Sequence, residues 1–310
     1  MINEIKYINI AITDRCNLKC AHCDIWQKKK KNEIPLSLIK KVFDSGPTSK
    51  EVDIALTGGE PFLYNKFGDL IKLMLNKRAT SLKTISTNGT LKGKILRFLK
   101  EFYAYLPSGF ALHVSFDGIS HYQKQRNALP KEVLSCLYLI KKYYPDIPIK
   151  LKFTITPLNY TDIIPTYKFA TRNGLGFKIK LVEQALTYTN SIMRKAFFFE
   201  DDARKKIAAD LYHLRNNEKL ITTQEADFIG RTIGLLNGTN QKLPCKTPLE
   251  RIFIMPTGLV YSCLHLKQIG DLKKTKLAFI WNSKQNKENR IKAANRNCVG
   301  CVAYHGYGVS

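Results

Sequence analysis

Short β-prone runs alternate with longer amphipathic stretches over the first part of the chain. The β-prone runs fall at residues 5–12, 52–57, 82–86, 110–116, 149–155 and 177–182. Helical periodicity fills the intervals, at residues 36–43, 67–77, 91–103, 131–143 and 162–172. Strands joined by helices that are long enough to cross over form parallel sheets. The pattern therefore predicts an α/β fold, a partial (β/α)6 TIM-like barrel over residues 1–183, with its chemistry at the carboxyl ends of the strands.

A different pattern begins after the barrel. Charged helical sequence predicts a helical bridge over residues 184–242, with helices at residues 200–217 and 224–236. Beyond it, a turn sequence that ends at Gly258 separates two β-prone runs, at residues 251–255 and 259–263. That arrangement predicts a β-hairpin. We expect the hairpin to belong to a small C-terminal cluster-binding subdomain, residues 243–310.

The balance of charge narrows the candidate partners. Lys and Arg number 50 and Asp and Glu number 25, so the formal net charge is +25. A field of that sign raises the local concentration of anionic partners, such as acidic peptides, nucleic acid and phosphorylated molecules. A basic surface with no specific partner is an equally open interpretation. The apolar runs fall short of the ~18 residues of a membrane span, and the first residues do not resemble a signal peptide. We expect a cytoplasmic protein with no membrane partner.

Three of the eight cysteines form one motif directly after the first predicted strand. Cys16, Cys20 and Cys23 have the spacing C-x3-C-x2-C. In a reducing compartment such a group indicates metal binding or catalysis rather than disulfides. Three thiolates can hold a four-iron cluster and leave one iron open, whereas structural zinc takes four closed ligands. A zinc site completed by His22 or by a distant residue stays open at this point.

The cysteine motif resembles that of the radical S-adenosylmethionine (SAM) enzymes, whose open iron binds SAM. The resemblance implies a [4Fe–4S] cluster on Cys16, Cys20 and Cys23, with SAM as a second cofactor. One electron from the reduced cluster cleaves SAM, and the resulting 5′-deoxyadenosyl radical abstracts a hydrogen atom from the substrate. A reductant such as flavodoxin or ferredoxin is then an expected partner.

Other predicted strand ends carry segments that match the same family. Gly58-Gly59-Glu60-Pro61 resembles the GGEP motif, through which the SAM amino group is held. Segments 86–89 and 115–118 resemble those that reach the SAM ribose and carboxylate, although their Asn-Gly and Asp-Gly pairs equally suit simple turns. His22 stands where the family packs an aromatic or His side chain near the adenine; a partly exposed loop residue is the alternative. The resemblance implies SAM contacts from His22, Gly58, Gly59, Glu60, Ser86, Asn88 and Ser115.

The last quarter of the chain holds a complete set of four thiols. From spacing alone these cysteines suit either zinc or a second [4Fe–4S] cluster. After a radical SAM barrel they resemble the Twitch subdomain, a shorter relative of the SPASM extension, which implies one auxiliary [4Fe–4S] cluster. With every iron held by a thiolate, that cluster would relay electrons rather than bind substrate. The implied ligands are Cys245, Cys263, Cys298 and Cys301.

These features predict an oxidoreductase that forms a 5′-deoxyadenosyl radical and dehydrogenates or cross-links its substrate. Loss of a hydrogen atom and then a proton leaves one electron, which the auxiliary cluster can accept. The candidate catalytic bases are Glu183, past the last strand, and Asp117; a surface ion pair and a turn cap are their structural alternatives. Cys136 lies in an apolar helical pattern, so it offers no thiol for returning a hydrogen atom.

The substrate is predicted from the charge and the family together. The charge of +25 favours an acidic precursor peptide made by the ribosome, or another anionic substrate. A small aminocyclitol or sugar alcohol is the alternative within the family. A non-catalytic zinc or nucleic-acid-binding protein is the alternative from another class. Because the chain begins one strand before its cysteine motif, we expect a separate peptide-recognition protein to deliver the peptide.

Overall fold

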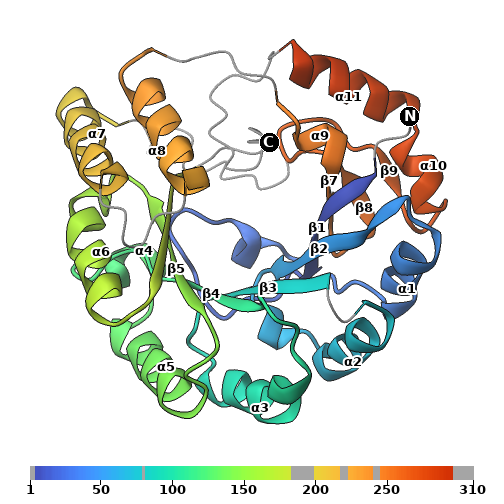
Figure 1. Cartoon of the computed structure of the whole chain (residues 1–310), viewed down its shortest axis with the longest axis horizontal. Coiled ribbons are helices and arrows are strands. Elements are labelled where there is room, and N and C mark those ends of the chain that lie inside the picture. The colour runs from blue at the N-terminus through green and yellow to red at the C-terminus, as the bar shows by residue number, and fades with distance from the viewer. Residues whose placement is uncertain (1–3, 79–80, 183–198, 217–222, 240–244, 296–310) are drawn as a thin grey trace.

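One curved sheet organises the part of the chain that the computed structural model describes, residues 4–78, 81–182, 199–216, 223–239 and 245–295. Within these residues, nine strands pair in the order β6-β5-β4-β3-β2-β1-β7-β8-β9 (Figure 1). The first six are parallel: β1 (Ile5–Thr13), β2 (Thr48–Gly58), β3 (Leu82–Thr87), β4 (Ala111–Ser115), β5 (Ile149–Ile155) and β6 (Gly176–Leu181). The predicted partial (β/α)6 barrel is confirmed.

Helices cover the outer face of this sheet (Figure 1). They are α1 (Leu36–Ser45), α2 (Phe67–Arg78), α3 (Lys92–Phe102), α5 (Pro130–Tyr143) and α6 (Ile163–Arg172). On α5, Val133, Cys136 and Ile140 are buried at helical spacing. Burial of each such side chain contributes roughly 1.5–3 kcal/mol, so these faces fix the helices on the sheet. The Cys136 thiol is therefore a core group, as predicted.

The strands separate two faces by strict alternation. On β6, Phe177 packs edge-on against Tyr167 of α6, with ring centroids 5.8 Å apart, so the buried positions of this strand face the helices. The next residue, Lys178, points to the other side of the sheet, because side chains alternate along a strand. The inner face of the barrel is therefore partly polar, and it is the face on which the strand ends present their side chains.

Two further helices continue the ring beyond α6 (Figure 1). These are α7 (Asp201–Arg215) and α8 (Thr223–Leu236), and both lie within the region predicted as a helical bridge. Helix α7 packs against α6 and against α8. Among the described residues, no helix is both long and apolar enough to cross a membrane.

The C-terminal hairpin is confirmed, and it joins the barrel sheet. Strand β7 (Arg251–Ile254) pairs in parallel with β1 and antiparallel with β8 (Leu259–Tyr261). Gly258 allows the turn between them, since its φ of +91° is costly for other residues. The short strand β9 (Gly270–Asp271) follows, and the surrounding helices are α9 (Thr247–Glu250), α10 (Leu277–Trp281) and α11 (Lys284–Ala294). The hairpin thus places Cys263 in a continuation of the barrel sheet.

Two differences from the predicted elements have local reasons. Strand β2 begins at Thr48, four residues before the predicted start, because Thr48 pairs with Ile5 of β1 although the polar residues there show no apolar alternation. The short helix α4 (Tyr122–Arg126) was not predicted, because its residues are polar. Their burial depends on neighbours that are distant in the sequence.

Candidate active site

The cysteine loop follows β1 and is held by its own backbone. Cys20 is buried, whereas Cys16 and Cys23 are half-buried. The Cys20 carbonyl accepts hydrogen bonds from the Cys23 amide at 3.2 Å and from the Trp26 indole at 3.3 Å. These bonds fold the loop into a turn from which the cysteine side chains project.

The three thiols suit a cationic iron cluster. The pKa of Cys16 is raised to about 11, mainly by burial and also by the nearby Cys20 and Cys23. Burial also raises the pKa of Cys20 and of Cys23. Thiols with raised pKa values give up their protons when iron binds, so three of them in one loop form a donor set that fits a [4Fe–4S] cluster.

The glycines of the GGEP segment allow two loops to touch. Gly59 donates its N–H to the Thr13 carbonyl, and Glu60 donates to the Arg15 carbonyl, both at 2.7 Å. A Cβ on Gly58 would lie 2.5 Å from the Thr13 oxygen, and one on Gly59 would lie 2.2 Å from the Arg15 oxygen. Only glycine fits at either position. The close approach predicted for these glycines is thus made to the cysteine loop, and their contact with SAM stays a prediction.

Glu60 ties the end of β2 to the end of β3. Its fully buried carboxylate accepts hydrogen bonds from the Thr87 hydroxyl and the Asn88 amide, each at 2.7 Å, and from the Phe62 amide at 3.3 Å. Burial raises the pKa of Glu60 to about 7, although these donors oppose the shift. The Glu60 carboxylate therefore joins two of the loops predicted to contact SAM through hydrogen bonds.

The Asn88 side chain connects these two loops to the cysteine loop through hydrogen bonds. Its side-chain amide donates to the Asn17 Oδ1 atom at 2.9 Å, and its Oδ1 accepts from the Thr90 amide at 2.9 Å. Asn17 in turn donates to the Thr90 hydroxyl at 2.8 Å. The cysteine loop, the GGEP segment and the end of β3 are therefore joined by hydrogen bonds, and we call these three segments the bonded unit.

The two predicted serines lie on neighbouring strands and share one lysine. Ser86 is on β3, and its hydroxyl accepts from the Lys152 ammonium at 3.5 Å. Ser115 ends β4 and is the register partner of Lys152 on β5. Both serines are half-buried. They therefore lie beside the bonded unit, on the side of β5.

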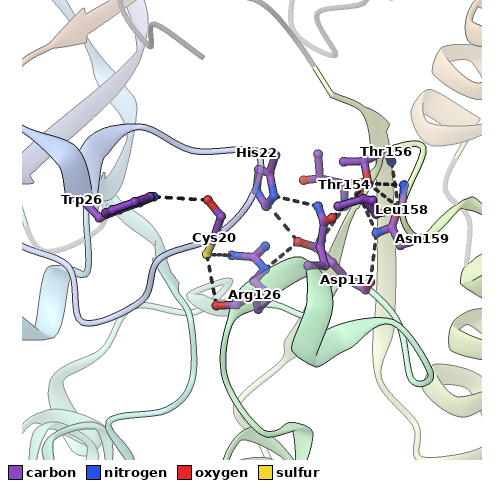
Figure 2. A network of polar contacts seen from close by, with 10 residues as sticks. Cys20, His22, Trp26, Asp117, Arg126, Thr154, Thr156, Leu158 and Asn159 are labelled. Carbon is purple, nitrogen blue, oxygen red and sulfur yellow. Dashed lines mark hydrogen bonds and ion pairs between the residues drawn. The ribbon is translucent and has the colours of Figure 1, made fainter. Parts of the chain in front are cut away.

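A buried guanidinium links the cysteine loop to the end of β4 (Figure 2). The Arg126 Nε atom forms an ion pair with the Asp117 Oδ2 atom at 2.5 Å, and its Nη1 atom donates to the Cys20 sulfur at 3.7 Å. The Asp117 Oδ1 atom accepts from the Thr154 amide at 2.7 Å. Asp117 is fully buried. Sequence reasoning missed Arg126, because a lone arginine in a polar segment carries no signal of its burial.

His22 is held in a neutral state by the same network. Its Nδ1 atom lies 2.7 Å from the Gln125 side-chain nitrogen, and its Nε2 atom lies 3.9 Å from the Asp117 carboxylate. Burial lowers the pKa of His22 to about 4, and Asp117 only partly opposes this. The Gln125 oxygen accepts from the Thr156 hydroxyl, so its nitrogen faces the ring as a donor. The His22 proton is then assigned to Nε2.

The remaining predicted site residues lie in the C-terminal part or outside the described residues. Cys263 is buried just after β8, and Cys245 is half-buried before α9. Cys298, Cys301 and Glu183 fall outside the described residues. The structure thus assembles the first cysteine set with its neighbouring loops, and it describes two of the four C-terminal cysteines.

Comparison with known families agrees with this arrangement of motifs. The family model described as the radical SAM superfamily matches residues 10–170, just over half of the chain. The chain belongs to the radical SAM superfamily. A second model, SPASM, described as an iron–sulfur cluster-binding domain, matches residues 245–302, which include all four C-terminal cysteines. The predicted cofactors, SAM and two [4Fe–4S] clusters, are confirmed by these matches.

Individual relatives differ in what they are named for. A GTP 3′,8-cyclase of Clostridium perfringens is 26% identical over 280 residues, which cover 85% of this chain and 82% of that protein. Streptococcus suis SuiB bound to the precursor peptide SuiA shares the fold with a TM-score of 0.68 and 13% identity, over 93% of this chain and 67% of SuiB. The enzyme anSMEcpe, with bound AdoMet and a Cp18Cys peptide, has a TM-score of 0.64 and 19% identity, over 91% and 81%.

Proposed function

We propose that this radical SAM enzyme is an oxidoreductase that dehydrogenates or cross-links an acidic, ribosomally made peptide. The observation that carries the proposal is the pairing of a three-cysteine loop in the barrel with four further cysteines in the SPASM match. The first cluster and SAM supply the 5′-deoxyadenosyl radical. A second cluster with four thiolate ligands supplies an acceptor for the electron that a net oxidation releases.

We assign cluster ligands and SAM contacts to separate groups of residues. Cys16, Cys20 and Cys23 hold the first cluster, and the four C-terminal cysteines hold the second. We assign the SAM contacts to the side chains and backbone of the bonded unit and its neighbours: His22, Gly58, Gly59, Glu60, Ser86, Asn88 and Ser115. Because hydrogen bonds join the cysteine loop, the GGEP segment and the end of β3, we expect a change in one of them to move the others.

Glu183 and Asp117 are the proposed bases. Asp117 has both carboxylate oxygens engaged, one by Arg126 and one by the Thr154 amide. A substrate proton has to displace one of these partners to reach it. Glu183 follows the last residue of β6 by two positions in the sequence. Replacing each with its amide, and measuring the yield of oxidised product against SAM cleavage, separates them.

The peptide substrate is supported by charge and by the fold neighbours. The chain carries a net charge of +25, which favours an acidic partner. Two of its fold neighbours hold peptides. The similarity to GTP 3′,8-cyclases makes a nucleotide substrate the second candidate. We propose a flavodoxin or ferredoxin as the reductant, and a separate protein for recognition of the peptide.

The decisive experiment separates SAM cleavage from oxidation. After anaerobic reconstitution we expect about eight iron atoms per chain, in two four-iron clusters. With SAM and reductant, the protein should form 5′-deoxyadenosine and lower the mass of an acidic peptide by about 2 Da, the loss of two hydrogens. Peptides encoded beside the gene are the first to test. Consumption of GTP with no change in any peptide would favour the second candidate and reject the first.

The auxiliary cluster is tested by a matched pair of variants. Cys298→Ala with Cys301→Ala should leave SAM cleavage intact and abolish the oxidised product, because the released electron has no acceptor. Cys136→Ala is the control, since that thiol is buried in the core on α5. It should keep both clusters and the product. Oxidised product at the wild-type yield from the double variant would reject the relay.

A further inference from the structure

Contacts of the main chain hold the short helix α4 against the cysteine loop. The Ala21 N–H donates to the Gln125 carbonyl at 2.9 Å, and the Arg126 carbonyl lies 3.8 Å from the Cys20 sulfur. Asn127 ends α4 in the left-handed conformation, with a φ of +53°. The end of α4 is therefore fixed beside the loop that carries the ligands of the first cluster.

The Arg126 guanidinium lies between the Cys20 sulfur and the Asp117 carboxylate (Figure 2). Its Nη1 atom is 3.7 Å from that sulfur, and its Nε atom is 2.5 Å from the Asp117 Oδ2 atom. Arg126 is 8% exposed and Asp117 is fully buried, so salt and water screen neither charge strongly. A guanidinium does not lose its proton in proteins. The Cys20 sulfur therefore faces a permanent positive charge, and one negative charge lies beyond it.

Charges beside a ligand sulfur act unequally on the two oxidation states of a cluster. A [4Fe–4S] cluster gains one electron, and with it one negative charge, when a reductant such as flavodoxin or ferredoxin reduces it. A nearby cation or a hydrogen bond to a ligand sulfur stabilises the reduced state, and a nearby anion destabilises it. Arg126 and Asp117 therefore act in opposite directions. Because Arg126 contacts the sulfur and Asp117 lies beyond it, the effect of Arg126 is the larger.

We propose that Arg126 raises the reduction potential of the first cluster through its hydrogen bond to Cys20, and that Asp117 limits this rise. A higher potential makes it easier for the reductant to deliver its electron. It also leaves less driving force for passing that electron to the SAM sulfonium, where it breaks the C5′–S bond. The two buried charges thus set the balance between these steps. The inference goes beyond the proposed function, because it applies to a peptide substrate and to a nucleotide substrate alike.

A redox titration of the reconstituted protein tests this assignment without turnover. Titanium(III) citrate reduces the protein anaerobically in the presence of mediators, and electron paramagnetic resonance follows the clusters. The signal that changes when SAM is added in a parallel sample belongs to the first cluster, because SAM binds its open iron. The midpoint potential of the first cluster is thereby read separately from that of the auxiliary cluster.

Two variants should move this midpoint in opposite directions. Asp117→Asn removes the opposing negative charge and should raise it. Arg126→Met with Asp117→Asn should lower it below the wild-type value, because the closer charge is lost as well. At one fixed potential, we expect the two variants to differ at least tenfold in the ratio of reduced to oxidised cluster, which is about 59 mV for one electron. The double variant replaces Arg126→Met alone because it leaves no carboxylate buried without its cation.

Arg172→Met is the matched control, because Arg172 is exposed on α6. It should leave the midpoint at the wild-type value. Equal midpoints in Asp117→Asn and in the double variant would overturn the inference. A midpoint at or below the wild-type value in Asp117→Asn would also overturn it, even if the double variant bound no cluster. Loss of SAM affinity in the double variant at an unchanged midpoint would assign Arg126 to the SAM carboxylate instead.

Discussion

Two neighbouring parts of the inner barrel surface differ in what surrounds their polar groups. At the ends of β1 to β4, the buried Glu60 and Asp117 carboxylates are each met by donors of the chain. On β5 and β6, burial and then the neighbouring Lys152 lower the pKa of Lys178. A wall whose polar groups are paired internally is stable before any ligand arrives and holds a cofactor in one geometry. A wall in which burial and neighbouring cations lower the pKa of a lysine has a stability that depends on pH.

Gly59→Ala should have the largest effect on stability in the paired wall, which is formed by the ends of β1 to β4. The added Cβ would meet the Arg15 carbonyl oxygen at 2.2 Å, so the cysteine loop has to move away from the GGEP segment. We expect a loss of about 5 kcal/mol in the free energy of unfolding, and little iron bound on reconstitution. Gly68→Ala on α2 is the control, because nothing lies near its Cβ; it should stabilise the protein slightly. Urea unfolding and iron content that match in the two variants would contradict the close approach.

Arg126→Met tests the buried ion pair of that wall. Removing the guanidinium leaves the Asp117 carboxylate buried without its cation, which costs about 3–5 kcal/mol. Adding Asp117→Asn should recover part of this loss, because the unpaired charge is removed. Lys72→Met breaks the exposed pair with Glu101 and should cost less than about 1 kcal/mol. Chemical denaturation measures all three, and a loss at Arg126 no larger than that at Lys72 would refute the pairing.

Lys178→Met tests the other wall, formed by β5 and β6, through the pH dependence of stability. The pKa of Lys178 is lowered to about 7 in the folded protein, from an ordinary value of 10.5. Between these values the unfolded chain binds the extra proton, so the wild-type free energy of unfolding rises with pH, by at most about 1.4 kcal/mol per unit. The variant lacks this term. Its stability advantage should be greatest below pH 7 and shrink by about 1–2 kcal/mol from pH 7.5 to pH 9, in denaturation series at each pH.

Lys168→Met is the control for that pH series, because Lys168 is exposed on α6. Its stability relative to the wild type should not change with pH over the same range. A pH-independent difference at Lys178 as well would remove the contrast between the two walls.

Asn88→Ala should have the smallest effect on stability. The variant loses the hydrogen bond to Asn17 and the turn bonds from Thr90, while the Asn88 amide still binds Glu60. We expect a loss of about 1 kcal/mol in the free energy of unfolding and weaker SAM binding. Asn282→Ala, which removes a bond within an exposed helix end, serves as the matched control. Unchanged SAM affinity in both would place Asn88 outside the cofactor site.

Much of the barrel was predictable from local sequence. Strand β5 was predicted with the bounds it has, and the other five strands differ mainly at their ends. Apolar alternation with a period of two, followed by amphipathic helices, is a local property, and burial of those faces follows from it. The three-cysteine loop and the GGEP segment were also visible, because each is contiguous and follows a strand.

The sequence by itself determined the succession of βα units, the family and the ligand types, since these depend on neighbours within a few residues. Only the tertiary structure decided that the C-terminal hairpin extends the sheet at β1, that Arg126 lies between Cys20 and Asp117, and that lysines of two strands form one face. The physical reason is the same in each case. These arrangements join residues far apart in the chain, and register and burial, rather than residue type, set which charges meet.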